Sequence, residues 1–218
     1  MDVAAGTIRG RVTFEGIPPS PPPVLLGAQD GCGSLRESAP FEKLIVREGG
    51  VANVLLRVKR GLPAGQSWPR PSEPVVLDQR GCVFEPHVLV ARVGAPVSLR
   101  NSDPLSHNVH VRPSNPANDA VNLTLAPSAK ESALLFAVPE LAIPVRCDIH
   151  PWMQAVLHVV EDPFYALSGA NGAFELRGLS AGEYELEACH EWLGRFTFSV
   201  QLSEAEGAEV LVRMSAPN

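Results

Sequence analysis

Four side chains that can bind a metal ion stand out in the sequence by their types and spacing. Cys147, His150 and Met153 follow the spacing C-x-x-H-x-x-M, and His107 lies further upstream. A thiolate, two imidazoles and a thioether are the donors of a type 1 copper centre, in which two His and one Cys form a plane and Met binds weakly along the axis. Zinc is the main rival metal, but a thioether is a poor fourth ligand for it. The sequence therefore predicts one type 1 copper ion held by these four residues.

The motifs around these residues resemble the cupredoxin family, and the ligand loop, with Pro after its second His, is similar to that of amicyanin-like members. The motifs are Phe84-Glu85-Pro86, Gly94-Ala95-Pro96-Val97, Asn101-Ser102-Asp103, His107-Asn108 and the loop from Cys147 to Met153, in the family's order. Five ordered motifs are a more specific signal than one pattern alone. The resemblance covers roughly residues 75–162 and implies a Greek-key β-sandwich that carries single electrons.

The resemblance also assigns roles to neighbours of the ligands. Asn108 is expected to hydrogen-bond across to the Cys147 loop and to hold it rigid. Pro151 and Trp152 either form an apolar rim around an exposed edge of His150, which would then be the exit for electrons, or Trp152 fills the core. His110 is expected to be structural, because three positions after His107 on a strand it points to the opposite face.

Strands have to position these residues, and the whole chain indicates β-structure. Its 21 Pro and 18 Gly separate short alternating runs, and no long stretch has apolar residues at helical spacing. Strands are expected at Thr7–Phe14, Lys43–Arg47 and Ala52–Val58. The Pro-rich segment Gly16–Pro23 is expected to be an extended surface loop. A second such segment, Gly61–Pro74, predicts a domain boundary.

The C-terminal part resembles the carboxypeptidase regulatory-like, or transthyretin-like, β-sandwich. It carries G-x-F-x-L-x-G-L-x-A-G-x-Y-x-L from Gly172 to Leu186, and the dipeptide Asn171-Gly172 predicts a β-hairpin. The opening strands of that family are similar to Gly6–Val12 and Ala52–Val58, before the copper motifs. Closing strands are expected at Phe196–Leu202 and Val210–Met214.

Together the two resemblances imply an all-β chain in which a cupredoxin-like sandwich is inserted in, or joined to, a transthyretin-like one. Residues 1–68 would form the first part of the regulatory-like sandwich and residues 69–162 the copper domain. Residues 163–218 would complete the first sandwich.

Three of the four cysteines are not needed for copper. Cys32 and Cys82 lie in Gly-flanked, loop-like settings, and a disulfide between them would fit an oxidising compartment. Sequence alone does not fix this pairing, so free thiols are the open alternative. Cys189 is expected to be an unpaired thiol on a strand.

Composition and charge bear on location and partners. A formal net charge of −6 argues against a nucleic-acid partner, which requires clustered Lys and Arg. No apolar run reaches the roughly 18 residues that suggest a membrane span. Residues 1–5 do not form a signal peptide. We expect a periplasmic or extracellular protein whose signal peptide is not part of this sequence.

The leading functional prediction is one-electron transfer, with Cu(I)/Cu(II) cycling between redox proteins such as a cytochrome or a dehydrogenase. Substrate chemistry is not expected, because a site with protein ligands on all sides leaves no open coordination position. Two alternatives belong to other classes. One is a copper-binding or storage protein without a redox partner, and the other is an adhesion or interaction module with a degenerate copper site.

Overall fold

The computed structural model describes residues 6–27, 31–129, 132–203 and 207–216. Within those residues the regular elements are β-strands and one short 3-10 turn, η2 (Cys32–Ser34). The prediction of an all-β chain is therefore confirmed. No helix among the described residues is long and apolar enough to cross a membrane.

The contacts divide the chain into two compact units. Unit 1 comprises residues 1–20, 43–67 and 162–218, and unit 2 comprises residues 21–42 and 68–161. Residues 21–42 therefore group with the copper motifs, whereas the sequence placed them in the first domain range. A disulfide between Cys32 and Cys82 explains the difference, because it ties this segment to unit 2.

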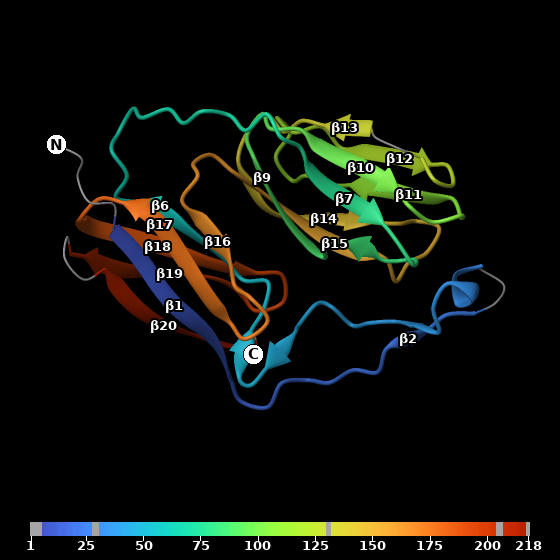
Figure 1. The fold of residues 1–218 in the computed structure, drawn as a ribbon, viewed down its shortest axis with the longest axis horizontal. Helices are drawn as coiled ribbons and strands as arrows, with labels where there is room; N and C mark the ends of the chain where they lie inside the picture. Colours follow the sequence, from blue (N-terminus) through green and yellow to red (C-terminus); the bar gives the residue numbers. More distant parts are fainter. Residues whose placement is uncertain (1–5, 28–30, 130–131, 204–206, 217–218) are drawn as a thin grey trace. The chain divides into compact units, whose positions relative to one another are not determined.

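Unit 2 consists of two sheets and a short two-stranded ribbon (Figure 1). Its strands are β2 (Val24–Leu25), β3 (Ser38–Ala39), β7 (Val75–Gln79), β8 (Phe84–Glu85), β9 (Val88–Arg92), β10 (Val97–Asn101), β11 (His107–Val111), β12 (Val121–Leu125), β13 (Ser132–Leu134), β14 (Glu140–Arg146) and β15 (Gln154–Val160). One sheet has the order β13-β10-β7-β8, the second has the order β12-β11-β14-β15-β9, and β2 pairs with β3. Parallel pairs join β7 to β10 and β9 to β15, while the other pairs are antiparallel.

The core of unit 2 explains which faces of these strands are buried. Apolar side chains from both sheets pack in one cluster, which includes Leu99, Val109 and Ile143. Cys147 and Met153 belong to the same cluster. Because buried side chains fix the register of a strand, packing of this core also fixes where the loops at the strand ends lie.

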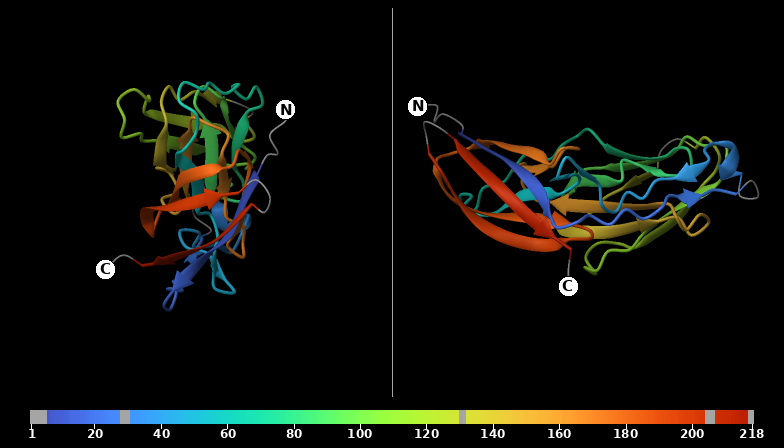
Figure 2. Two further views of the ribbon diagram at one scale, coloured as in Figure 1. Left: turned by 90° about the vertical axis from the view of Figure 1, so that its left-hand side faces the viewer. Right: turned by 90° about the horizontal axis from the view of Figure 1, so that it is seen from below.

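Unit 1 also consists of two sheets. Its strands are β1 (Gly6–Glu15), β4 (Val46–Arg47), β5 (Gly50–Val51), β6 (Leu55–Arg60), β16 (Tyr165–Leu167), β17 (Ala173–Leu179), β18 (Gly182–His190), β19 (Gly194–Leu202) and β20 (Ala208–Ser215). One sheet has the order β17-β1-β5-β4, with β20 also paired to β1, and the other has the order β16-β6-β18-β19. β1 and β20 run parallel and side by side (Figure 2). Each sheet of unit 1 therefore combines strands that come before unit 2's main segment with strands that come after it.

Two predictions of local structure in unit 1 are wrong. The segment Ala52–Val58 is not one strand, because Asn53 has a left-handed φ of 62° and the chain passes there from β5 in one sheet to β6 in the other. Asn171-Gly172 is a turn but not a hairpin, because β16 and β17 belong to different sheets. Gly172 has a φ of 82°, and a Cβ there would lie 2.1 Å from the carbonyl oxygen of Val12. Packing against β1 therefore requires glycine.

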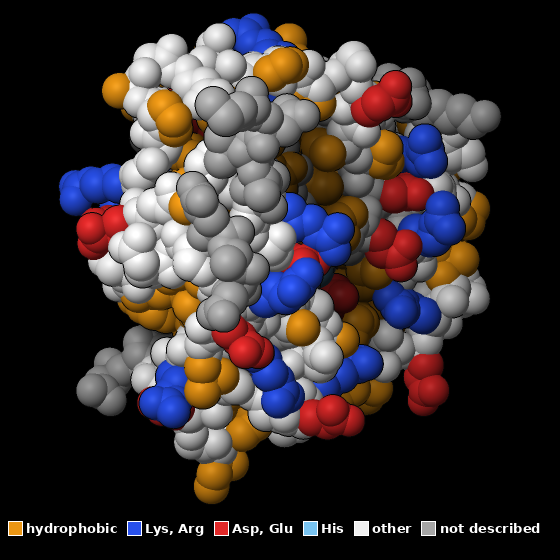
Figure 3. All heavy atoms as spheres, turned by 60° about the vertical axis from the view of Figure 1, so that its left-hand side comes forward, with side chains coloured by type: hydrophobic (Ala, Val, Ile, Leu, Met, Phe, Trp, Pro, Cys, Tyr) orange, Lys and Arg blue, Asp and Glu red, His pale blue; other side chains and the backbone are white. Residues whose placement is uncertain are grey.

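Charged side chains of unit 1 form ion pairs across its strands. Arg9 pairs with Glu175 at 2.7 Å, and Lys59 pairs with Glu185 at 3.1 Å. On the face shown in Figure 3, basic and acidic side chains are interspersed.

Candidate metal centre

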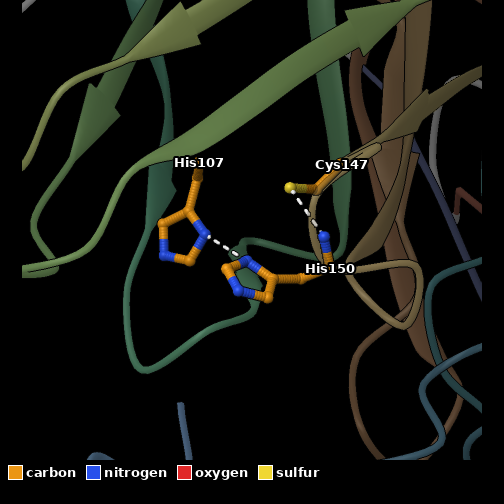
Figure 4. Close-up of side chains that lie close together, drawn as sticks. All are labelled: His107, Cys147 and His150. Carbon is orange, nitrogen blue, oxygen red and sulfur yellow. Dashed lines mark hydrogen bonds between the residues drawn. The ribbon is translucent and has the colours of Figure 1, made fainter. Parts of the chain in front are cut away.

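Three predicted ligands meet at one end of unit 2. His107 is the first residue of β11, Cys147 directly follows β14, and His150 lies in the loop that joins β14 to β15. Because β11 and β14 are hydrogen-bonded neighbours, the three side chains point toward one another (Figure 4). One donor atom from each lies within 4.8 Å of the other two, and all three residues are buried. The structure thus groups two imidazoles and a thiol where a metal ion could bind.

Backbone N–H groups of the ligand loop and of β11 contact the sulfur of Cys147. The backbone N–H groups of Asn108 and His150 donate to this sulfur at 3.5 and 3.4 Å. The loop is closed by hydrogen bonds from Cys147 N to the Met153 carbonyl, at 3.1 Å, and from Met153 N to the His150 carbonyl, at 2.9 Å. Two N–H donors stabilise a thiolate, which is the form of cysteine that binds metals.

The two imidazoles face each other through their Nδ1 atoms, which lie 2.8 Å apart. On the other side of its ring, His107 Nε2 lies 2.9 Å from Oδ2 of Asp103. His107 is completely buried and His150 is 5% exposed. The expected exposed edge of His150 can therefore be only a small area, because little of the residue reaches the surface.

Met153 lies at the end of the ligand loop and is buried, with an exposed fraction of 1%. Its backbone accepts from Cys147 and donates to His150, so its position is fixed relative to both. Ligation by its sulfur stays a prediction.

Asn108 bridges the two strands as predicted. Its Oδ1 accepts from Asp148 N at 2.5 Å, and its Nδ2 lies 3.3 Å from Asp148 Oδ2. Asp148 Oδ2 also accepts from Asn122 Nδ2 at 2.9 Å and lies 2.9 Å from His110 Nδ1. The hydrogen bonds from His110 and then Asn122 lower the pKa of the Asp148 carboxyl below its ordinary value. This network holds the residue after Cys147.

The remaining histidine and tryptophan predictions have clear outcomes. His110 lies against Asp148 and is not part of the group formed by the three ligands, which agrees with the opposite orientation expected for it. Trp152 is partly buried against the core and donates through Nε1 to the Cys82 carbonyl at 3.1 Å. Its ring centroid also lies 5.1 Å from that of His150. Trp152 therefore packs against the core and the ligand at once.

The cysteine predictions are also settled by the structure. Cys32 and Cys82 form a disulfide with their Cα atoms 5.8 Å apart, so the sulfur of Cys82 is not a free thiolate. Cys189 is a buried free cysteine, and burial raises the pKa of its thiol.

Two polar residues at the site were missed by the sequence analysis. Asp103 was quoted only as part of a motif, although a metal-ligating histidine commonly donates its other ring N–H to a carboxylate. Gln79 is fully buried, and its Nε2 donates to the Asn108 carbonyl at 3.0 Å. No sequence pattern identifies this glutamine, because it comes from a distant strand, β7.

Comparisons with known proteins found no matching family model and no matching curated protein. Among solved structures the chain is similar to a copper-containing nitrite reductase from Thermus scotoductus SA-01, with 23% identity and a TM-score of 0.37 over 47% of this chain and 26% of that one. It is similar to a reduced amicyanin mutant, with 23% identity and a TM-score of 0.35 over 39% of this chain and 81% of that one. A purple cupredoxin from Nitrosopumilus maritimus matches with 18% identity and a TM-score of 0.32, over 39% of this chain and 98% of that one.

The chain thus spans about a quarter of the nitrite reductase and most of the two smaller proteins. All these similarities are weak.

Proposed function

We propose that unit 2 binds one type 1 copper ion and carries single electrons between redox proteins. The observation that supports this most is the buried grouping of His107, Cys147 and His150, with donor atoms within 4.8 Å of one another. Two imidazoles and a thiolate are the equatorial donors of a blue-copper centre, and Met153 on the same loop offers the weak axial thioether. Bound copper would supply a one-electron Cu(I)/Cu(II) couple.

The protein's own part in this function is to keep one geometry in both redox states. The sulfur of Cys147 receives two backbone N–H groups, from Asn108 and His150. The side chain of Asn108 holds the next residue, Asp148, in place. A ligand loop fixed in this way changes little when the charge on the metal changes. Little reorganisation is what efficient electron transfer needs.

Burial of the donors supports a carrier rather than an enzyme. His107, Cys147 and Met153 have exposed fractions of 0, 1 and 1%, so a substrate has no direct path to these donors. His150 is the most exposed of the four, at 5%. We propose that electrons pass through its edge to and from a partner protein. The Cys32–Cys82 disulfide favours an oxidising compartment such as the periplasm or the cell exterior.

The first test is substitution of the thiolate. Copper bound by Cys147 should give an intense absorption band near the red end of the visible spectrum, since thiolate-to-Cu(II) charge transfer is strong. Cys147→Ser is expected to abolish the band and leave the fold intact, because Ser is a weak, hard donor. Cys189→Ser is the matched control, because Cys189 is equally buried and belongs to unit 1.

Full colour in Cys147→Ser would overturn the assignment of the site. Copper binding by the wild type with the band present, but without reversible reduction, would support the storage alternative instead.

A further inference from the structure

The carboxyl group of Asp103 makes three hydrogen bonds in the interior of unit 2. Its Oδ1 accepts from Gly81 N at 2.6 Å, and its Oδ2 accepts from Cys82 N at 2.8 Å. The same Oδ2 lies 2.9 Å from Nε2 of His107. Asp103 is 4% exposed, so water does not compete strongly for these bonds.

The backbone of Asp103 is fixed as well. Asn101 Oδ1 accepts from Asp103 N at 3.1 Å, and the Asp103 carbonyl accepts from Ser128 N at 3.0 Å. The side chain therefore approaches His107 from one defined direction.

A two-residue turn between β7 and β8 presents the two amides to Asp103. Gly81 and Cys82 have left-handed φ values of 59° and 57°, as both central residues of a type I′ turn do. Arg80 N donates to the Val83 carbonyl across this turn at 3.0 Å. A left-handed conformation is costly for a residue with a side chain. The disulfide from Cys82 to Cys32 and the two bonds to Asp103 offset this cost.

The hydrogen bonds determine which nitrogen of His107 can bind a metal. Both oxygens of Asp103 already accept from N–H groups, so the group facing them from His107 is an N–H as well. The proton of the neutral imidazole is then on Nε2, and Nδ1 keeps its lone pair. Nδ1 is the atom that lies 2.8 Å from Nδ1 of His150, inside the group of donors.

We propose that Asp103 is a positioning residue of the metal centre, held by the disulfide-tied turn Gly81–Cys82, and that it presents Nδ1 of His107 to the metal. The proposal rests on the proposed function only in taking the metal to be copper. A carboxylate behind a ligand histidine fixes the tautomer and the ring orientation and makes the imidazole a stronger donor. The disulfide thereby acts on the metal centre through Cys82 N, Asp103 and His107.

The most direct test needs no metal. In the metal-free, full-length chain at about pH 8, above the ordinary pKa of histidine, ¹⁵N NMR of the imidazoles should show His107 with its proton on Nε2. A proton on Nδ1 of His107 in the wild type would overturn the proposal. This measurement uses the wild type, so it does not depend on whether a variant folds.

The second test compares two substitutions that remove the same charge. Asp103→Asn turns one acceptor into an N–H₂ group that opposes the amide of Gly81 or Cys82. Asp78→Asn is the control, because Asp78 is also a buried acid of unit 2 but bonds to Arg80 and Ser102. We expect Asp103→Asn to weaken Cu(II) binding by roughly 10- to 100-fold, measured by competition with a chelator, and to raise the reduction potential more than the control does. Equal effects in both variants would mean that Asp103 acts only through its charge, against the proposal.

The disulfide's part is tested with Cys32→Ser/Cys82→Ser. This variant should show a mixture of His107 tautomers and weaker Cu(II) binding than the wild type. Wild-type tautomer and affinity in this variant would contradict a role for the disulfide.

Failure of the two proposals can be told apart. If the wild type has the expected tautomer but binds copper without the charge-transfer band, the proposed function fails and the role of Asp103 in orienting His107 stands. If the band is present but His107 carries its proton on Nδ1, the function stands and the role of Asp103 fails.

Discussion

Removing the Cys32–Cys82 disulfide is expected to lower the free energy of unfolding by about 4 kcal/mol. The bridge joins residues separated by 50 positions. In the chain-entropy model, closing a loop of that size removes about 14 cal/mol/K of entropy from the unfolded chain, or about 4 kcal/mol at 25 °C. The structure gives this loop an unusual path. The chain leaves unit 2 after residue 42, contributes residues 43–67 to unit 1, and then returns.

In the segment of residues 21–42, besides the disulfide, Leu26 packs against the core of unit 2, and Glu42 lies 3.9 Å from Nδ1 of His87. The short pair β2–β3 closes on itself, and exposed Leu25 and Leu35 add little buried apolar surface. Without the covalent tie, noncovalent contacts of this kind alone have to offset the conformational entropy of the segment. We therefore expect the measured decrease in the free energy of unfolding to approach the full value of about 4 kcal/mol.

The assay is urea unfolding of Cys32→Ala/Cys82→Ala, followed by tryptophan fluorescence. Trp152 is a suitable probe, because its Nε1 donates to the Cys82 carbonyl. Cys189→Ala is the control for loss of a cysteine side chain without loss of a cross-link. A decrease of less than about 1 kcal/mol, well below the typical range, would show that noncovalent contacts hold the segment, and would refute this reasoning.

Two further predictions concern the axial ligand and the split sandwich. Met153→Gln should keep copper and colour but lower the reduction potential, because an oxygen donor favours Cu(II) over Cu(I). Voltammetry measures this, and an unchanged or raised potential would mean that the sulfur of Met153 does not bind the metal. A fragment of residues 163–218 should be unfolded or insoluble, because it lacks β1, which pairs with β17 and β20, and β6, which pairs with β16 and β18. A well-dispersed NMR spectrum of this fragment would show that these residues form a complete domain.

The sequence predicted the parts of the site that depend on chain order. Cys147, His150 and Met153 share one short loop, so their proximity follows from spacing alone. His107 required the assumption that two strands far apart in sequence are neighbours, and the pairing of β11 with β14 shows that they are.

The sequence did not predict contacts that depend on register between distant strands. The hydrogen bonds that Asp103 accepts from Gly81 and Cys82 are of this kind, because they join the loop before β11 to the turn between β7 and β8. The Cys32–Cys82 pairing stayed open for the same reason, since connectivity depends on the folded path of the chain. Asn171-Gly172 shows the opposite failure. Its turn chemistry was correct, but packing against β1 sends the flanking strands to different sheets.

Reversible reduction of the copper-loaded, full-length chain tests the central claim most directly. With copper bound by His107, Cys147 and His150, the oxidised protein should show an intense band near the red end of the visible spectrum. Uptake of a single electron per copper should bleach the band, and reoxidation should restore it fully over repeated cycles. A weak spectrum without a thiolate band, or release of copper on reduction, would contradict a role in electron transfer.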